Sequence, residues 1–191
     1  QGLRPLLHSP RIIIQRIMNY GIAVHGGAGT IPKEDMTPER EQAYRAGLED
    51  ALRRGHLVLK DGGSALDAVE AAVRALEDCP FFNAGKGSVF NADGQHEMDA
   101  SIMEGHTLRA GAVAGVGNVK NPVGLARRVM DKSPHVLISG MGAFEFAHHE
   151  KVLLEDDEYF FNQFRYEQWQ QVAGTGTVQL DHSSGGTQDG K

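Results

Sequence analysis

The stretch with the clearest chemical potential is residues 75–90, ALEDCPFFNAGKGSVF, in which Gly85 and Gly87 flank Lys86. A phosphate-binding loop needs a glycine five positions before its Gly-Lys pair and a hydroxyl residue after the lysine, and this stretch has neither. Glycine-rich turns next to a helix end leave main-chain carbonyl oxygens that must find an N–H donor, a water molecule or a cation. Two interpretations stay open: a loop satisfied by water, or a loop braced by a monovalent cation that main-chain carbonyls surround.

Other motifs with known chemistry are absent or incomplete. The sequence contains no Gly-x-Ser-x-Gly, so the HGGAG turn is poor support for a serine esterase, and GVGNV and GMGAF lack the third glycine of a dinucleotide fingerprint. Nine scattered histidines and one cysteine form no zinc pattern, and we interpret His148, His149 and Glu150 as solvated helix residues. We predict that His25 is a structural histidine and Cys79 a small buried apolar residue.

The composition is that of one ordinary globular domain: of 191 residues, 40% are apolar and 23% are charged. No apolar run approaches the ~20 residues that a bilayer-crossing helix needs. The net charge of −6 is spread along the chain, which argues against nucleic acid or an anionic membrane as a partner. A single cysteine forms no internal disulfide, so we expect a reducing, cytoplasmic location.

The amino-terminal segment differs from the rest of the chain. Residues 1–18 carry three arginines and no acid, and they lack the unbroken apolar core of a secretory signal. We interpret them as a leader or a non-native extension, with Met18 as a candidate start. From Tyr20, the stretch YGIAVHGGAG predicts a short apolar strand that runs into a glycine turn, because Ile22 and Val24 are β-branched and glycines follow them.

Two helices are predicted to lead into the glycine-bearing stretch at residues 75–90, the glycine loop. Thr37 followed by Pro38 and Glu39 is typical of a helix start. The buried face predicted for this helix comprises Tyr44, Leu48, Ala51, Leu52 and Gly55. After a Gly62-Gly63 break, Ser64 predicts the cap of a second helix. Its predicted apolar stripe comprises Leu66, Val69, Val73 and Leu76. The two helices should therefore pack side by side and release the chain at Cys79.

The remaining sequence alternates strands and helices. MDASIM and LRAGAVAGV predict two strands, the second rich enough in alanine and glycine for another layer to approach closely. Asn121-Pro122 predicts the start of a third helix, and HVLIS at 135–139 a short core strand. From 174 to 191, ten of eighteen residues are glycine, serine or threonine, which predicts a flexible tail. This order predicts an α/β or α+β layered domain.

Five segments together carry a resemblance to a known family: IAVHGGAG, CPFFNAGKGSVFNADG, MDASIMEG, AGAVAGV and KNPVGLARRVM. In this order and at this spacing, the chain resembles the plant-type asparaginases, also called isoaspartyl aminopeptidases, from Tyr20 to about His182. Members of this family are N-terminal nucleophile hydrolases with an α+β fold, a four-layer αββα sandwich. The resemblance implies that residues 19–173 are the α-subunit part of such a sandwich.

The family is made as an inactive precursor that cuts itself just before a threonine and so yields an α chain and a β chain. This sequence is similar to the α chain alone, with residues 174–191 as the tail before the cut, because the family's Gly-Thr-Val-Gly junction is missing. Thr177 lies in a partial match, GTGTVQLD, but a cut there would leave only residues 177–191, too few to house a substrate site. We therefore expect no catalytic nucleophile here and a separate β subunit that begins with threonine.

The resemblance also implies roles for residues of the glycine loop. A structural sodium ion would be bound by the main-chain oxygens of Leu76, Glu77, Cys79, Phe82, Ala84 and Lys86. Lys86 departs from the apolar residue expected there, so its charge must point away from the ion. Asn83 matches the family asparagine beside the nucleophile and the scissile peptide, where its amide can donate to a carbonyl without titrating. Gly26 and Gly27 would form the flexible loop near the cut site.

The implied activity is hydrolysis of L-asparagine and isoaspartyl (β-aspartyl) dipeptides, with no catalytic cofactor. The β-chain threonine would use its own α-amine as general base and form an acyl-enzyme. The resemblance implies an (αβ)2 heterotetramer that acts on small molecules and has no nucleic-acid or membrane partner. Two alternatives stay open: an aspartylglucosaminidase or threonine aspartase of the same superfamily, and a non-catalytic scaffold module.

Overall fold

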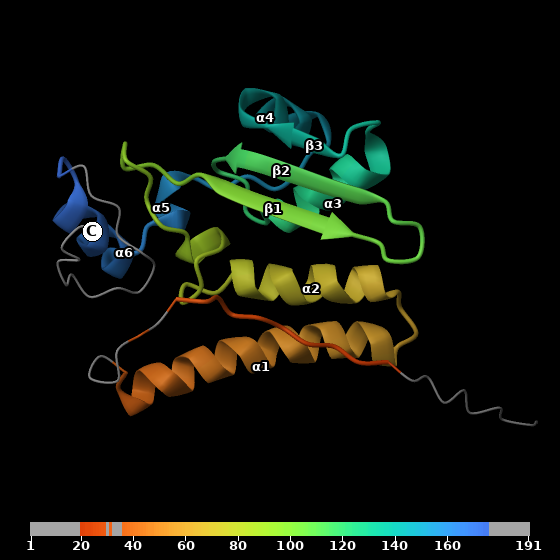
Figure 1. Cartoon of the computed structure of the whole chain (residues 1–191), viewed down its shortest axis with the longest axis horizontal. Helices are drawn as coiled ribbons and strands as arrows, with labels where there is room; N and C mark the ends of the chain where they lie inside the picture. Colours follow the sequence, from red (N-terminus) through yellow and green to blue (C-terminus); the bar gives the residue numbers. More distant parts are fainter. Residues whose placement is uncertain (1–19, 30, 32–35, 176–191) are drawn as a thin grey trace, which may run out of the picture.

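The chain combines helices with one small sheet, as a computed structural model describes for residues 20–29, 31 and 36–175 (Figure 1). In chain order the elements are α1 (Pro38–Lys60), α2 (Ala65–Glu77), the 3₁₀ turn η2 (Gly85–Gly87), β1 (Met98–Met103), β2 (Ala110–Val116), α3 (Pro122–Lys132), β3 (Leu137–Ser139), α4 (Gly140–His149), α5 (Asp157–Phe160) and α6 (Gln163–Val172). This mixture of helix and sheet agrees with the predicted α+β class. The predicted leader at 1–18 and the predicted tail from 176 onward lie outside the described residues.

Both helix starts predicted from capping residues are confirmed. Thr37 precedes α1, and its hydroxyl oxygen accepts a hydrogen bond from the Arg40 N–H at 3.2 Å. Ser64 precedes α2, and its hydroxyl oxygen accepts one from the Asp67 N–H at 3.0 Å. The first N–H groups of a helix have no acceptor within the helix, so these side chains satisfy donors that would otherwise need water.

The two helices pack side by side through small residues (Figure 1). Gly55 of α1 is buried, and a Cβ atom there would lie 2.9 Å from the Ala68 carbonyl oxygen of α2. The face that α2 buries includes three alanines: Ala68, Ala72 and Ala75. The prediction that Val69 is buried is wrong, since it is 41% exposed. Successive helical residues are rotated by about 100°, so a face that includes Ala68 turns Val69 outward.

The sheet has the strand order β1-β2-β3, with β1 and β2 antiparallel and β2 and β3 parallel. The strands predicted from MDASIM and LRAGAVAGV are thereby confirmed. The stretch HVLIS does contain a strand, but its prediction as a core strand is wrong, because Leu137 is 56% exposed. Successive side chains of a strand point to opposite faces of the sheet, so Leu137 lies on the open face while its neighbour Ile138 packs against the core.

Helix α3 covers one face of the sheet and forms the main core with it. Val113 and Val116 of β2 pack in one cluster with Leu125 and Val129 of α3, and all four are buried. The predicted close approach of another layer to the second strand is confirmed at Gly111. A Cβ atom there would collide with the Ala126 carbonyl oxygen and lie 2.5 Å from the Met130 nitrogen, both backbone atoms of α3.

We expect Gly111→Ala to lower the free energy of unfolding by about 1–3 kcal/mol, the usual cost of overpacking a filled core. The backbone of α3 must move to admit the methyl group. Urea unfolding of the complete protein measures the change. Gly105→Ala is the matched control, because a Cβ atom at Gly105 meets nothing within 4 Å. Equal unfolding midpoints for the two variants would contradict the close packing.

The strand predicted from Tyr20 is not formed among the described residues. Residues 20–25 are extended and lie across α1 and α2 (Figure 1). Ile22 and Val24 are half-buried, whereas Ala23 and His25 are exposed, so the side chains alternate as in a strand. A strand also requires a hydrogen-bonded neighbour, and no described strand lies beside this segment. No helix among the described residues is long and apolar enough to cross a membrane.

Candidate functional site

The glycine loop begins where α2 ends and closes on itself through main-chain hydrogen bonds. The Cys79 N–H donates to the Leu76 carbonyl oxygen at 3.2 Å, and the Ala84 N–H donates to the Phe82 carbonyl oxygen at 2.8 Å. The Gly87 N–H donates to the Ala84 carbonyl oxygen at 3.1 Å and so closes η2. Three of the six carbonyls predicted to bind sodium therefore lie in tight turns of one short segment.

Several carbonyl oxygens of this loop converge on its two glycines. A Cβ atom on Gly85 would collide with the Glu77 carbonyl oxygen, and Gly85 also has a φ of +52°, which favours glycine. A Cβ atom on Gly87 would collide with the Phe82 carbonyl oxygen and lie 2.7 Å from that of Pro80. Uncharged main-chain oxygens crowded in this way are a donor set that suits a hard monovalent cation. The residues present therefore fit the implied sodium ion.

Lys86, the one predicted ligand residue with a basic side chain, places its ammonium over an aromatic ring. Its Nζ lies 5.0 Å from the ring centroid of Tyr159 in α5. Lys120 Nζ lies 4.6 Å from the same centroid and 2.8 Å from Glu155 Oε1. The Lys86 charge thus has a cation–π partner in α5.

Asn83 has its amide oriented by the chain that follows it. The Val89 N–H donates to Asn83 Oδ1 at 3.0 Å, and Asn83 is exposed. Since only the oxygen of an amide accepts hydrogen bonds, this contact decides which end of the side chain carries the NH2 donors. The NH2 group of Asn83 is therefore directed away from the Val89 N–H.

The predicted glycine turn lies against the same loop. A Cβ atom on Gly26 would lie 3.0 Å from the Phe82 ring and 3.0 Å from Leu48. Gly27 has a φ of +114°, and its N–H donates to His25 Nδ1 at 3.2 Å, in agreement with a structural role for that histidine. The structure therefore brings the glycine turn at 26–27 into contact with the loop that carries Asn83.

Cys79 is half-buried in a small apolar cluster that also contains Phe82 and Leu76. Burial raises the pKa of its thiol, against the opposing effect of a backbone hydrogen bond at Phe81. A thiol that is harder to ionise is a poorer nucleophile. This agrees with the prediction that Cys79 is an apolar packing group.

Glu77, predicted from the sequence only as a main-chain ligand, has a buried carboxyl group. It is 3% exposed, and its Oε1 accepts a hydrogen bond from the Val123 N–H at 2.8 Å, near the start of α3. Burial raises its pKa from 4.5 to about 7, against the opposing hydrogen bonds from Val123 and Asn121. Its Oε2 is buried with no hydrogen-bond partner among the described residues. No local pattern distinguishes such a glutamate from a solvated one.

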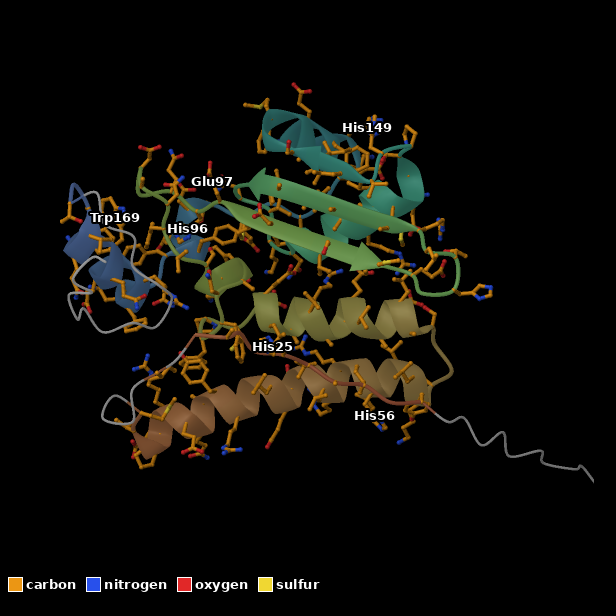
Figure 2. The ribbon with its side chains drawn as sticks, in the orientation of Figure 1. His25, His56, His96, Glu97, His149 and Trp169 are labelled. Carbon is orange, nitrogen blue, oxygen red and sulfur yellow. The ribbon has the colours of Figure 1, made fainter. Side chains whose placement is uncertain are left out.

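Three further side chains hold the loop from outside and were not predicted. The Ser88 hydroxyl lies 3.0 Å from His96 Nδ1, and burial lowers the pKa of this histidine. Asn162 Nδ2 donates to the Pro80 carbonyl oxygen at 3.0 Å, and Arg165 Nε donates to that of Gly87 at 3.1 Å. Figure 2 shows His96 beside the start of β1, well away from His25, His56 and His149. No cluster of metal-binding side chains occurs in the described part of the chain.

Comparison with known proteins identifies the family. The family model described as Asparaginase matches residues 18–190. The isoaspartyl peptidase of Salmonella typhimurium is 48% identical over 162 residues, which cover 85% of this chain and 52% of that protein. The plant-type L-asparaginase of Thermococcus kodakarensis is 53% identical over 152 residues, 79% of this chain and 47% of that protein. The isoaspartyl peptidase/L-asparaginase of Rattus norvegicus is 52% identical over 126 residues, 66% of this chain and 37% of that protein.

The chain thus forms a mixed helix and sheet domain with a glycine loop lined by main-chain carbonyl oxygens. It belongs to the asparaginase family. The resemblance inferred from the five sequence segments is confirmed. The chain spans about half the length of the curated relatives that it matches, 52%, 50% and 46% for three of them.

Proposed function

We propose that this chain is the α subunit of a threonine-dependent hydrolase that cleaves L-asparagine and β-aspartyl dipeptides. The observation that carries the proposal is the oriented amide of Asn83, in the loop whose Phe82 contacts Gly26. The matched relatives bear the names isoaspartyl peptidase and plant-type L-asparaginase. A neutral amide with its oxygen engaged donates through its NH2 group, and such a donor can hold a substrate carbonyl during acyl transfer.

The nucleophile would come from the part of the protein outside this chain. A threonine at the amino terminus of a β subunit carries both a hydroxyl and an α-amine, whose ordinary pKa of ~7.7–8.0 leaves much of it neutral near pH 7.5. The amine would take the hydroxyl proton as the oxygen attacks the β-carbonyl, and would pass that proton to the nitrogen that leaves as ammonia or an amino acid. Water would then release aspartate from the acyl-enzyme. Two such αβ pairs would form the (αβ)2 assembly, and the cytoplasmic location stays a prediction.

The β subunit would also complete the four-layer αββα sandwich. On the sheet face opposite α3, Met103 and Leu137 are 55% and 56% exposed. On the helix pair, residues 20–25 are extended and have no described strand beside them. A second sheet that included residues 20–25 would satisfy this segment's backbone and cover the open face of the first sheet.

Sodium would be held in this proposal by the main-chain oxygens of the glycine loop. The set predicted from the resemblance comprises Leu76, Glu77, Cys79, Phe82, Ala84 and Lys86. We add the carbonyl of Pro80 to this proposed set, because its oxygen would lie 2.7 Å from a Cβ atom on Gly87. A bound cation would offset the mutual repulsion of these oxygens and so keep the loop, and Asn83 within it, in one conformation.

We expect replacement of sodium by tetramethylammonium at equal ionic strength to lower the thermal unfolding midpoint. The shift should be about 2–4 °C for each 1 kcal/mol of binding free energy lost. Differential scanning fluorimetry of the complete protein measures it. Gly87→Ala, whose methyl group would occupy the space between two carbonyls, should remove the response to sodium. An unfolding midpoint that is the same in sodium and in tetramethylammonium would favour a loop whose carbonyl oxygens are satisfied by water.

The activity is tested on the complete protein that contains this chain. Mass spectrometry should find two chains, one of them beginning with threonine, and assays should show hydrolysis of β-aspartyl-leucine and L-asparagine. Hydrolysis of a glycosylated asparagine alone would favour an aspartylglucosaminidase instead. An uncut protein with no hydrolysis of any of these substrates would favour a non-catalytic module.

A further inference from the structure

A buried arginine of α6 holds the loop that carries Asn83. Arg165 is only 2% exposed. Its Nε donates to the Gly87 carbonyl oxygen at 3.1 Å, and its Nη1 donates to Gln168 Oε1 at 3.1 Å. Removing a guanidinium from water is costly unless hydrogen bonds compensate it in a defined geometry. The position of Arg165 is therefore closely specified, and so is the carbonyl group that it binds.

The Gly87 carbonyl belongs to a peptide group that is held at both ends. Its oxygen accepts a hydrogen bond from Arg165 Nε. The Ser88 N–H of the same peptide group donates to the Gly85 carbonyl oxygen at 3.0 Å. Ser88 is 3% exposed, and its hydroxyl lies 3.0 Å from His96 Nδ1. Rotation about Ser88 is thus restricted, and the direction of the next N–H group, that of Val89, follows from the peptide before it.

The Val89 N–H is the donor that orients Asn83. It donates to Asn83 Oδ1 at 3.0 Å, and this contact turns the NH2 end of the amide away from the Val89 N–H. Loss of the constraint on Gly87 would let the Val89 N–H turn and leave the amide without a fixed direction. A misplacement of about 1 Å in a positioned group can cost about a hundredfold in rate.

We propose that Arg165 is a positioning residue for Asn83, which acts through the Gly87 carbonyl and the two peptide groups that connect it to the Val89 N–H. This inference rests on the proposed function, because it concerns the same amide. It gives α6 a defined influence on the reaction through the backbone of the glycine loop. The influence is on the chemical step rather than on substrate binding.

The test is a double-mutant cycle in the complete protein with Arg165→Met and Asn83→Ala, singly and combined. Turnover of β-aspartyl-leucine is measured per free amino-terminal threonine, so that misfolded or unprocessed molecules do not count. Arg165→Met should lower kcat about tenfold to a hundredfold. KM should change by less than about twofold, because no group that binds the substrate in the ground state is lost. In the Asn83→Ala background the same substitution should lower kcat no further.

Arg53→Met is the matched control, since Arg53 is exposed and pairs with Asp50 on α1. Its kcat should equal that of the unsubstituted protein. Arg165→Lys keeps the positive charge and most of the side chain, so it should lower kcat less than Arg165→Met does. If Arg165→Met does not fold, the double-mutant cycle is carried out with Arg165→Lys instead.

Two results would overturn the positioning role. One is an unchanged kcat per threonine together with a lower melting temperature, and the other is a double variant in which both losses multiply. An unsubstituted protein without hydrolysis would instead overturn the proposed function itself.

Discussion

Replacing Asn83 with alanine is expected to slow self-cleavage and turnover by about a hundredfold to a thousandfold while the protein stays folded. The side chain is exposed and makes one contact that orients it, the Val89 N–H on Oδ1. Removing an exposed side chain costs little stability, whereas losing a preorganised donor to a developing oxyanion costs about 2.7–4 kcal/mol of barrier height in known cases. Rates of precursor cutting by gel and of β-aspartyl-leucine hydrolysis by amino-acid release measure the effect.

Asn83→Asp separates the two ends of the amide. The carboxylate keeps an acceptor for the Val89 N–H but has no NH2 group, so the loop should stay in place while the activity falls as far as in the alanine variant. Asn91→Ala is the matched control, because Asn91 Oδ1 also accepts backbone N–H groups, those of Asp93 and Gln95. Processing rates for Asn83→Asp that match those of the unsubstituted protein would remove the amide donors from the mechanism.

Replacing Glu77 with glutamine is expected to abolish a stability loss of about 3 kcal/mol that this carboxyl causes as the pH rises. Burial raises the Glu77 pKa in the folded protein to about 7 from the ordinary 4.5 that it regains on unfolding. Below pH 4.5 both states hold the proton, so the group costs nothing. As the pH rises towards 7 the unfolded state releases it more readily, and stability falls by about 1.4 kcal/mol per pKa unit.

The measurement is urea unfolding between pH 4.5 and 8 in tetramethylammonium salts. The unsubstituted protein should lose stability relative to Glu77→Gln through this window and reach a constant difference above pH 7. Glutamine retains an oxygen to accept the Val123 N–H. Glu49→Gln, which changes an exposed carboxyl of α1, is the control and should give a curve parallel to that of the unsubstituted protein. If Glu77→Gln also gives a curve parallel to that of the unsubstituted protein, the pKa of Glu77 does not differ between the folded and unfolded states.

Helix starts and the antiparallel strand pair could be predicted from the sequence because their causes are local. Thr37 and Ser64 bond to N–H groups three residues away, and the glycine that lets α3 approach β2 is visible in the AGAVAGV run. Predictions that depended on neighbours were less successful. The stretch from Tyr20 has the alternation of a strand without a described partner, and Leu137 lies on the open face of the sheet.

The candidate site divides in the same way. Asn83 and the glycine loop could be singled out because glycine spacing and the resemblance both mark one short stretch, and their roles stay predictions. The contacts that hold the loop could not be predicted. Arg165 bonds to Gly87 across 78 positions and Asn162 to Pro80 across 82, and neither side chain stands in a recognisable motif.

By itself, the sequence determined the family, the capped helices and the existence of a glycine loop rich in main-chain acceptors. Only the tertiary structure decided that Glu77 is buried against the start of α3 and that Arg165 reaches the loop from α6. The physical reason is that capping, turn formation and periodicity act over a few residues, while burial, pKa and buried hydrogen bonds depend on which distant segments exclude water together.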